Sequence, residues 1–232
     1  MDTNKSSMEW MEYLENITVL NLYNRKMKDM QMADFSEALQ YNTTLTKLDL
    51  SCNELTCRGI QSLSNALRFN NTLQSLDLSS PILTNIGNNI SVDGAKSLAN
   101  ALELNSGLKE LKVFRTGIDL EGAKAFARCL MINDTLQNLD LYWNNIGDEG
   151  SKALAEALEI NTTISHLNLS KSNISSQSME AITALIANRT KHEDKEPAPK
   201  MEPRQPLIKP RRDSSNLFSQ ERQLVYVNKR RL

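Results

Sequence analysis

The chain has 232 residues, three Cys, two His and nearly balanced charge, with 27 Lys and Arg against 28 Asp and Glu. Three cysteines do not make a disulfide framework, and no apolar run approaches the roughly 20 residues that a membrane-spanning helix needs. The first ten residues lack the basic and apolar regions of a signal peptide. We therefore expect reduced thiols, no membrane span and a cytoplasmic location.

The N-terminal segment, residues 1–16, precedes the regular part of the sequence. Ser6 and Glu9 have the spacing of a capping box, and Trp10, Met11 and Leu14 give a helix one apolar stripe. The first unit of a repeat array exposes a slice of its core unless a cap covers it. Residues 1–16 are therefore predicted to form an N-terminal cap in which Trp10 packs.

Residues 17–189 contain about six copies of one unit, which is most regular between Thr135 and Asn161. Each copy opens with the L-x-x-L-x-L pattern of a strand, and its first apolar residues are Ile17, Leu45, Leu73, Leu108, Leu136 and Ile164. Four of the five steps between these residues are 28 residues long, and one is 35. An amphipathic helix follows each strand and ends at an asparagine: Asn42, Asn70, Asn105, Asn133 and Asn161. Such a unit cannot bury its apolar side alone, so the columns predict a solenoid of stacked copies.

Two copies depart from the pattern. In the fourth, Lys112 stands where the others have Asp or Asn, and Thr116 replaces the loop Asn. The third is interrupted between strand and helix by a seven-residue insertion, Pro81 to Gly87. Insertions in repeat proteins fall on loops of one face, often the binding face. The insertion is therefore expected on the loop edge beside the strands.

The composition changes at residue 190. Residues 191–232 carry 11 Lys and Arg against 6 Asp and Glu, and five of the six prolines lie between Pro197 and Pro210. Residues 190–232 are therefore predicted to be a basic, proline-containing, disordered tail. Ser214 ends an R-R-x-S pattern that basophilic kinases favour and is a candidate phosphosite. The basic run could also be a nuclear signal, a nucleic-acid patch, a latch onto the acidic solenoid or a solvated linker.

The register of L-x-x-L-x-L, loop Asn, Gly and A-x-x-L-x-x-A-L resembles the ribonuclease-inhibitor class of leucine-rich repeats. That class includes ribonuclease inhibitor, the repeat domains of NOD-like receptors and, more distantly, the Ran GTPase-activating protein. The resemblance covers residues 17–189 and implies an α/β fold. It implies an open arc of about six repeats, with parallel strands on the concave face and helices on the convex face. It says little about function, because the same repeat serves many partners.

The strand side chains between the core leucines project from the concave face, and most of them are small or acidic. The larger or basic exceptions are the candidate protein-binding residues: Tyr23, Lys112, Phe114, Arg115, Tyr142, Trp143 and His166. Aromatic residues and Arg dominate binding hot spots, although the rings could also simply pack on one another. The acidic residues Asp49, Asp77 and Asp140 suggest a solvated face rather than a metal site.

No constellation of catalytic, cofactor-binding or metal-ligating residues is visible, and neither His166 nor His192 has a credible triad. We therefore expect a non-enzymatic module that binds a protein partner, with no cofactor, metal or small-molecule substrate. One alternative is regulation of a small GTPase, as the Ran activator resemblance implies. Another is binding of nucleic acid or an anionic surface through the basic tail.

Overall fold

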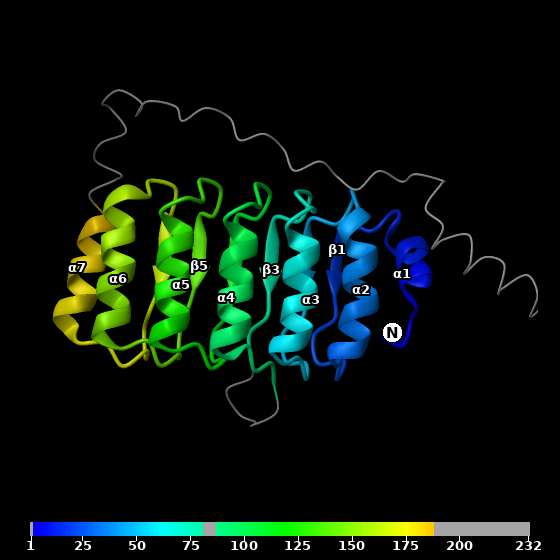
Figure 1. The fold of residues 1–232 in the computed structure, drawn as a ribbon, viewed down its shortest axis with the longest axis horizontal. Coiled ribbons are helices and arrows are strands. Elements are labelled where there is room, and N and C mark those ends of the chain that lie inside the picture. The colour runs from blue at the N-terminus through cyan, green and yellow to red at the C-terminus, as the bar shows by residue number, and fades with distance from the viewer. Residues whose placement is uncertain (1, 81–86, 188–232) are drawn as a thin grey trace, which may run out of the picture. The chain divides into compact units, whose positions relative to one another are not determined.

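The computed structural model describes residues 2–80 and 87–187. Its helices are α1 (Ser7–Leu14), α2 (Asp29–Tyr41), α3 (Cys57–Leu67), α4 (Ser91–Leu102), α5 (Leu120–Leu130), α6 (Gly147–Ile160) and α7 (Ser176–Ala187). Its strands are β1 (Val19–Asn21), β2 (Lys47–Asp49), β3 (Ser75–Asp77), β4 (Glu110–Lys112), β5 (Asn138–Asp140) and β6 (His166–Asn168). From β1 onward strands and helices alternate, and the helices form one layer in front of the strands (Figure 1). The predicted α/β solenoid is confirmed.

The six strands form one open parallel sheet in chain order, from β1 to β6. The pairing places one leucine of each strand in a single row: Leu20, Leu48, Leu76, Leu111, Leu139 and Leu167. These leucines point toward the helices and the residues beside them point away, because side chains alternate along a strand. We call the sheet face that looks away from the helices the strand face. The strand-exit edge is where the strands end, and the helix-exit edge is where the helices end.

Helix α1 packs against α2 and begins with the predicted capping box. The backbone N–H of Ser6 donates to the Glu9 carboxylate at 2.7 Å, and the Glu9 N–H donates to the Ser6 hydroxyl at 3.4 Å. Trp10 is fully buried, and its ring meets that of Phe35 edge-on with centroids 4.9 Å apart. The apolar stripe of α1 therefore joins the same core as the repeats.

The helix-exit asparagines tie each repeat to the one before it. Asn105 is representative: its side-chain N–H groups donate to the carbonyls of Leu67 and Asn70, both at 2.7 Å. Its Oδ1 accepts the backbone N–H groups of Gly107 and Leu108 at 3.0 and 2.8 Å. The same inter-repeat bonds recur at Asn70, Asn133 and Asn161. Each asparagine thereby satisfies buried backbone groups where one helix ends and the next strand begins.

A second set of asparagines follows the strands. Asn53 and Asn144 each donate to a carbonyl of their own strand end and to one of the preceding repeat. Asn88 makes the equivalent pair of bonds, to Leu50 and Leu78 carbonyls, both at 2.9 Å. The insertion precedes this asparagine in the sequence; its residues 81–86 lie outside the described residues, so its expected place on the loop edge stays a prediction. Thr116 replaces the asparagine in the fourth repeat, and its hydroxyl donates to the carbonyl of Val113 in its own repeat.

Within residues 2–80 and 87–187, no helix is both long and apolar enough to cross a membrane. The division of the chain into a cap (1–16), a repeat domain (17–189) and a basic tail (190–232) stays a prediction. The tail and the candidate phosphosite Ser214 lie outside the described residues. The functional residues discussed below therefore all belong to the repeats.

Candidate functional site

Three aromatic side chains meet at the strand-exit edge of two adjacent repeats. Phe114 and Tyr142 follow β4 and β5 at the same repeat position, and their ring centroids are 6.1 Å apart in an edge-on arrangement. Trp143 continues the group, with its centroid 6.1 Å from that of Tyr142 and the rings again edge-on. Parallel pairing of β4 with β5 brings the three rings together, because equivalent residues of neighbouring strands lie about 4.8 Å apart.

A lysine from the next repeat completes this group. The Nζ atom of Lys171 lies 4.8 Å from the centroid of Trp143 and 5.8 Å from that of Tyr142. At these distances the ammonium is attracted by the negative faces of the rings, a contribution of about 0.5–1 kcal/mol at exposed sites. We call Phe114, Tyr142, Trp143 and Lys171 the aromatic cluster. Lys171 was not among the residues predicted from the sequence.

The backbone at this edge turns through the left-handed region in successive repeats. The φ angles are +53° at Arg115, +53° at Trp143 and +57° at Lys171. Backbone hydrogen bonds between neighbouring repeats hold this conformation: the Arg115 N–H donates to the Tyr142 carbonyl, and the Trp143 N–H donates to the Ser170 carbonyl, both at 3.0 Å. A side chain with a Cβ costs roughly 1–2 kcal/mol there relative to the right-handed region. The turn aligns Arg115, Trp143 and Lys171 in one column along the edge.

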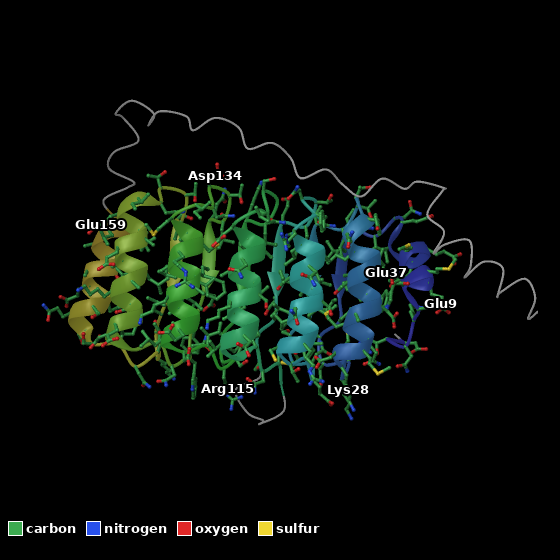
Figure 2. All side chains as sticks on the ribbon, in the orientation of Figure 1. Glu9, Lys28, Glu37, Arg115, Asp134 and Glu159 are labelled. Carbon is green, nitrogen blue, oxygen red and sulfur yellow. The ribbon has the colours of Figure 1, made fainter. Side chains whose placement is uncertain are left out.

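Exposure separates this cluster from the aromatic residues of the core. Trp143 is 39% exposed, whereas Trp10, Phe35 and Phe126 are fully buried. Phe114 and Tyr142 are half-buried. Arg115 lies at the strand-exit edge with Lys28, opposite Asp134 and Glu159 (Figure 2). The cluster is therefore an accessible surface and not a part of the interior.

Two predicted residues lie away from the cluster. Tyr23 follows β1, three strands from β4, or roughly 14 Å along the sheet. It contacts Cys52, and the charge that Cys52 carries when ionised, together with a hydrogen bond to it, raises the pKa of Tyr23. His166 opens β6 and its Nδ1 lies 3.1 Å from the side-chain oxygen of Asn138. It is at the opposite end of its strand from Lys171.

Lys112 lies among carboxylates on the strand face. The register puts it between Asp77 and Asp140, and its Nζ is 3.2 Å from the Glu110 carboxylate. Partial burial alone would lower the pKa of Lys112, but the bond to Glu110 and the nearby acidic charges outweigh this effect and raise it. A hydrogen bond from the Ser75 hydroxyl, 2.6 Å long, lowers the pKa of Glu110. Lys112 thus offsets the acidic charge of the strand face beside the aromatic cluster.

Among the described residues, no group of three or more His, Cys, Asp and Glu side chains could hold a metal ion. The acidic row of Asp49 and Asp77 is followed by Lys112, which is an unfavourable neighbour for a cation. Burial is the largest influence on Asp77 and raises the pKa of its carboxyl. This row therefore has the character of a partly desolvated polar surface.

Asp77→Asn is expected to raise the free energy of unfolding at pH 7. The pKa of Asp77 is higher in the folded chain than in the unfolded chain. The carboxyl therefore contributes fully to the free energy of unfolding below its unfolded pKa, and this contribution is lost as pH rises through the folded pKa. Asn does not ionise, and its Oδ1 can still accept the Ser79 N–H, which lies 2.9 Å from the carboxylate. Urea unfolding at pH 7 and pH 3 should show the gain at pH 7 and its near disappearance at pH 3. A gain larger at pH 3 than at pH 7 would contradict the assigned direction.

Comparison with known proteins identifies the repeats. A family model described as Leucine Rich repeat matches residues 41–64, 105–127, 133–155 and 161–182. A search of curated protein sequences finds no significant match. One similar solved structure is entitled Leiomodin-1 Actin-Binding Site 2, with 18% identity, a TM-score of 0.46, and coverage of 80% of this chain and 90% of that one. Another is a tropomodulin C-terminal domain from Caenorhabditis elegans, with 12% identity, a TM-score of 0.49, and coverage of 81% and 95%.

The four matched stretches each run from a helix-exit asparagine or the residue before it, through a strand, into the following helix. The matched repeats share their strand register and their inter-repeat hydrogen bonds with the unmatched ones. The chain is therefore an α/β solenoid built from leucine-rich repeats.

Proposed function

We propose that the chain is a non-enzymatic protein-interaction module of the cytoplasm, which binds a partner on its strand face and strand-exit loops. The observation that carries this proposal is the aromatic cluster, in which three rings and a lysine from three consecutive repeats share one exposed surface. Tyr and Trp combine large apolar area with few rotatable bonds, and they are enriched in binding hot spots. The repeats themselves are proposed to be of the ribonuclease-inhibitor type, which their 28-residue spacing supports.

Packing of the rings on one another does not account for the whole arrangement. Trp143 stands at a left-handed position that Asn or Gly adopts more easily, and two-fifths of its surface remains exposed. The equivalent residue one repeat earlier in this column is Arg115, and the equivalent residue one repeat later is Lys171. A large ring at this position is therefore unfavourable for the fold but favourable for contact with another molecule.

The charges around the cluster indicate the chemistry of the partner surface. Arg115 and Lys171 stand one repeat before and one repeat after Trp143 in the left-handed column, and the Lys171 ammonium lies over the exposed ring. A complementary surface would present an apolar or aromatic side chain with carboxylates on either side. Such charge matching contributes mainly to specificity and to the rate of association.

Trp143→Asn is expected to abolish capture of this partner while leaving the fold intact. Asn tolerates the positive φ, so relief of backbone strain offsets the lost ring contacts. Loss of a hot-spot tryptophan should cost about 2 kcal/mol or more, which is roughly a 30-fold loss of affinity. The measurement is affinity capture from cell extract with the full chain, followed by titration of the captured protein.

Met8→Asn is the matched control, because it removes another exposed apolar side chain, 73% exposed on α1, which lies outside the sheet. Its capture should equal that of the unaltered chain. Capture that is unchanged by Trp143→Asn, with an unaltered circular dichroism spectrum and unfolding midpoint, would refute the proposed surface. The GTPase alternative has no support among the described residues, and the tail alternative concerns residues outside them.

A further inference from the structure

A second surface runs along the opposite edge of the solenoid. One large apolar side chain stands directly before each helix-exit asparagine, in five consecutive repeats: Tyr41, Phe69, Leu104, Ile132 and Ile160. We call these five residues the helix-exit ladder and each of them a rung. Four of them are well exposed, at 38% for Tyr41, 41% for Leu104, 46% for Ile132 and 58% for Ile160. Phe69 is half-buried.

The ladder is not required to close the core. The residue three positions before each ladder residue is already buried in the core at the same helical turn: Ala38, Ala66, Ala101, Cys129 and Ala157. A row of exposed apolar side chains that continues across five repeats is larger than the scattered apolar residues of an ordinary surface. The sequence pattern that builds the solenoid does not explain it, because the asparagine side chains, and not the ladder side chains, make the inter-repeat hydrogen bonds at the helix exits.

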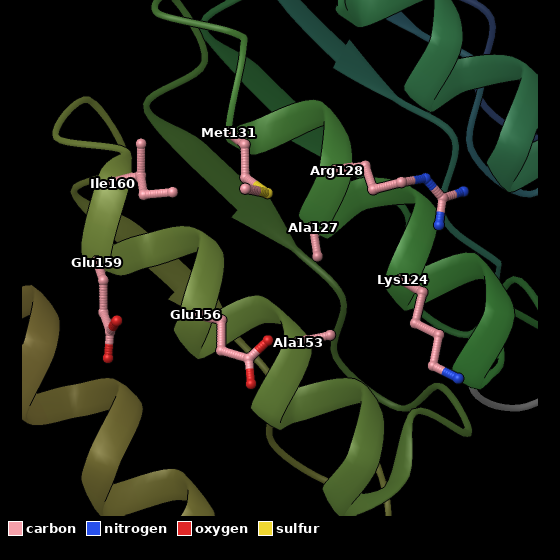
Figure 3. A pocket seen from close by; sticks show the side chains of 8 residues that line it. All are labelled: Lys124, Ala127, Arg128, Met131, Ala153, Glu156, Glu159 and Ile160. Carbon is pink, nitrogen blue, oxygen red and sulfur yellow. The ribbon is translucent and has the colours of Figure 1, made fainter.

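A groove of about 470 Å³ between α5 and α6 adjoins the last rung (Figure 3). Four apolar residues, Ala127, Met131, Ala153 and Ile160, line it together with four charged ones, Lys124, Arg128, Glu156 and Glu159. Met131 is 49% exposed, so the groove is bordered by two accessible apolar side chains. The apolar part of the groove offers room for one large apolar side chain of a partner, and anchoring residues bind in this way.

Charged residues border the ladder unequally. Five acidic residues lie within four sequence positions of a ladder residue: Glu37, Glu103, Asp134, Glu156 and Glu159. Basic residues occupy only two of the corresponding positions, Arg68 and Arg128. Figure 2 places Asp134 and Glu159 at this edge. The apolar row is therefore bordered mainly by carboxylates, which favour a basic partner.

The spacing of the rungs matches a helix laid across the ends of α2 to α6. Packed helices are about 8–10 Å apart, so the rungs recur at about that distance along the edge. Seven residues of an α-helix advance about 10.5 Å. A helix with an apolar residue at every seventh position would therefore meet successive rungs, and about 29 residues would span all five.

From this match of apolar spacing and charge, we propose that the helix-exit ladder binds a basic amphipathic helix of another protein. The helix lies across the ends of α2 to α6, with one apolar side chain on each rung and one in the α5–α6 groove. Its Lys and Arg residues face Glu37, Asp134 and the glutamates of α6. This site is on the edge opposite the aromatic cluster, so it does not depend on the function proposed above.

The test titrates the full chain into a fluorescent synthetic peptide of about 29 residues, with Leu at every seventh position and Lys, Gln and Ala elsewhere. A second peptide has the same composition with its leucines shuffled. The chain variant is Leu104→Ser with Ile160→Ser, and the matched control is Val19→Ser with Met30→Ser. Met30 is 84% exposed and Val19 61%, so both pairs remove exposed apolar side chains.

We expect the peptide with leucines at every seventh position to bind about tenfold more tightly than the shuffled one. The Leu104/Ile160 variant should bind this peptide about tenfold more weakly than the unaltered chain does. The control pair should bind it with unchanged affinity. Equal binding of the two peptides, absence of binding, or unchanged affinity of the Leu104/Ile160 variant would overturn it. Self-association of the chain that only this variant abolishes would identify a second copy as the occupant and would also overturn it. Trp143→Asn should leave the peptide affinity unchanged, so failure here and failure of the strand-exit proposal are distinguishable.

Discussion

Asn105→Ala is expected to lower the free energy of unfolding by about 3–5 kcal/mol, because about 1 kcal/mol is lost per hydrogen bond and buried partners remain unsatisfied. The side chain of Asn105 is 3% exposed and makes four bonds to backbone groups. Two of its partners, the carbonyls of Leu67 and Asn70, belong to the preceding repeat. Alanine leaves all four groups without this partner in a site closed to water.

Asn100→Ala is the control for this prediction, since Asn100 lies on the exposed side of α4 in the same repeat. It should change the free energy of unfolding by no more than about 0.5 kcal/mol, as for other exposed positions. Urea unfolding of both variants measures the difference. If Asn105→Ala costs less than about 1 kcal/mol, the asparagine bonds are not a main source of stability between repeats.

Leu111→Ala should destabilise the centre of the solenoid by about 2.7–5 kcal/mol, the cost of a buried cavity at a leucine site. Leu111 is fully buried on β4, in register with Leu76 on one side and Leu139 on the other. In a solenoid each repeat contacts only its neighbours. A cavity in the middle therefore weakens both interfaces of the fourth repeat, and unfolding is expected to separate into two transitions.

The same substitution at the end of the sheet provides the comparison. Leu167 occupies the equivalent position on the edge strand β6 and is only partly buried. Leu167→Ala should cost about half as much or less, because fewer contacts and a smaller cavity are involved. Its unfolding should remain a single transition. Equal costs for the two variants would show that the repeats do not behave as a chain of neighbouring units.

Most of the fold could be predicted because each structural rule is repeated in several places. The strand leucines, the helix-exit asparagines and the N-terminal capping box recur at fixed spacing or follow a known local pattern, and each is found where it was expected. The resumption of the third repeat at Asn88 also follows from the spacing, since this asparagine makes the bonds of Asn53 and Asn144. Because each local pattern recurs at fixed spacing, the patterns together determine the register of the repeats.

The site could be predicted only in part, because it depends on contacts between different repeats. The sequence singled out Phe114, Tyr142 and Trp143, but it included Tyr23 and His166, which lie elsewhere on the sheet. It missed Lys171, although this residue follows Trp143 by one repeat length. The left-handed turn that aligns the two is a property of the backbone, and only the column of equivalent positions could have indicated it.

The two edges of the solenoid therefore differ in chemistry. The strand-exit edge has rings flanked by Arg115 and Lys171, whereas the helix-exit edge has an apolar ladder bordered mainly by carboxylates. We propose an acidic partner surface for the first edge and a basic helix for the second. A single chain with both could hold two different partners at once, which is a common use of a rigid repeat scaffold.

The most direct test of the strand-exit surface uses the fluorescence of Trp143 in the complex with its captured partner. The chain has two tryptophans; Trp10 is fully buried and Trp143 is 39% exposed, so a Trp10→Phe variant isolates the surface signal. Quenching by acrylamide should be strong in the free chain and should fall several-fold when the partner is bound. A stable complex in which Trp143 is quenched as readily as in the free chain would show that the partner binds elsewhere.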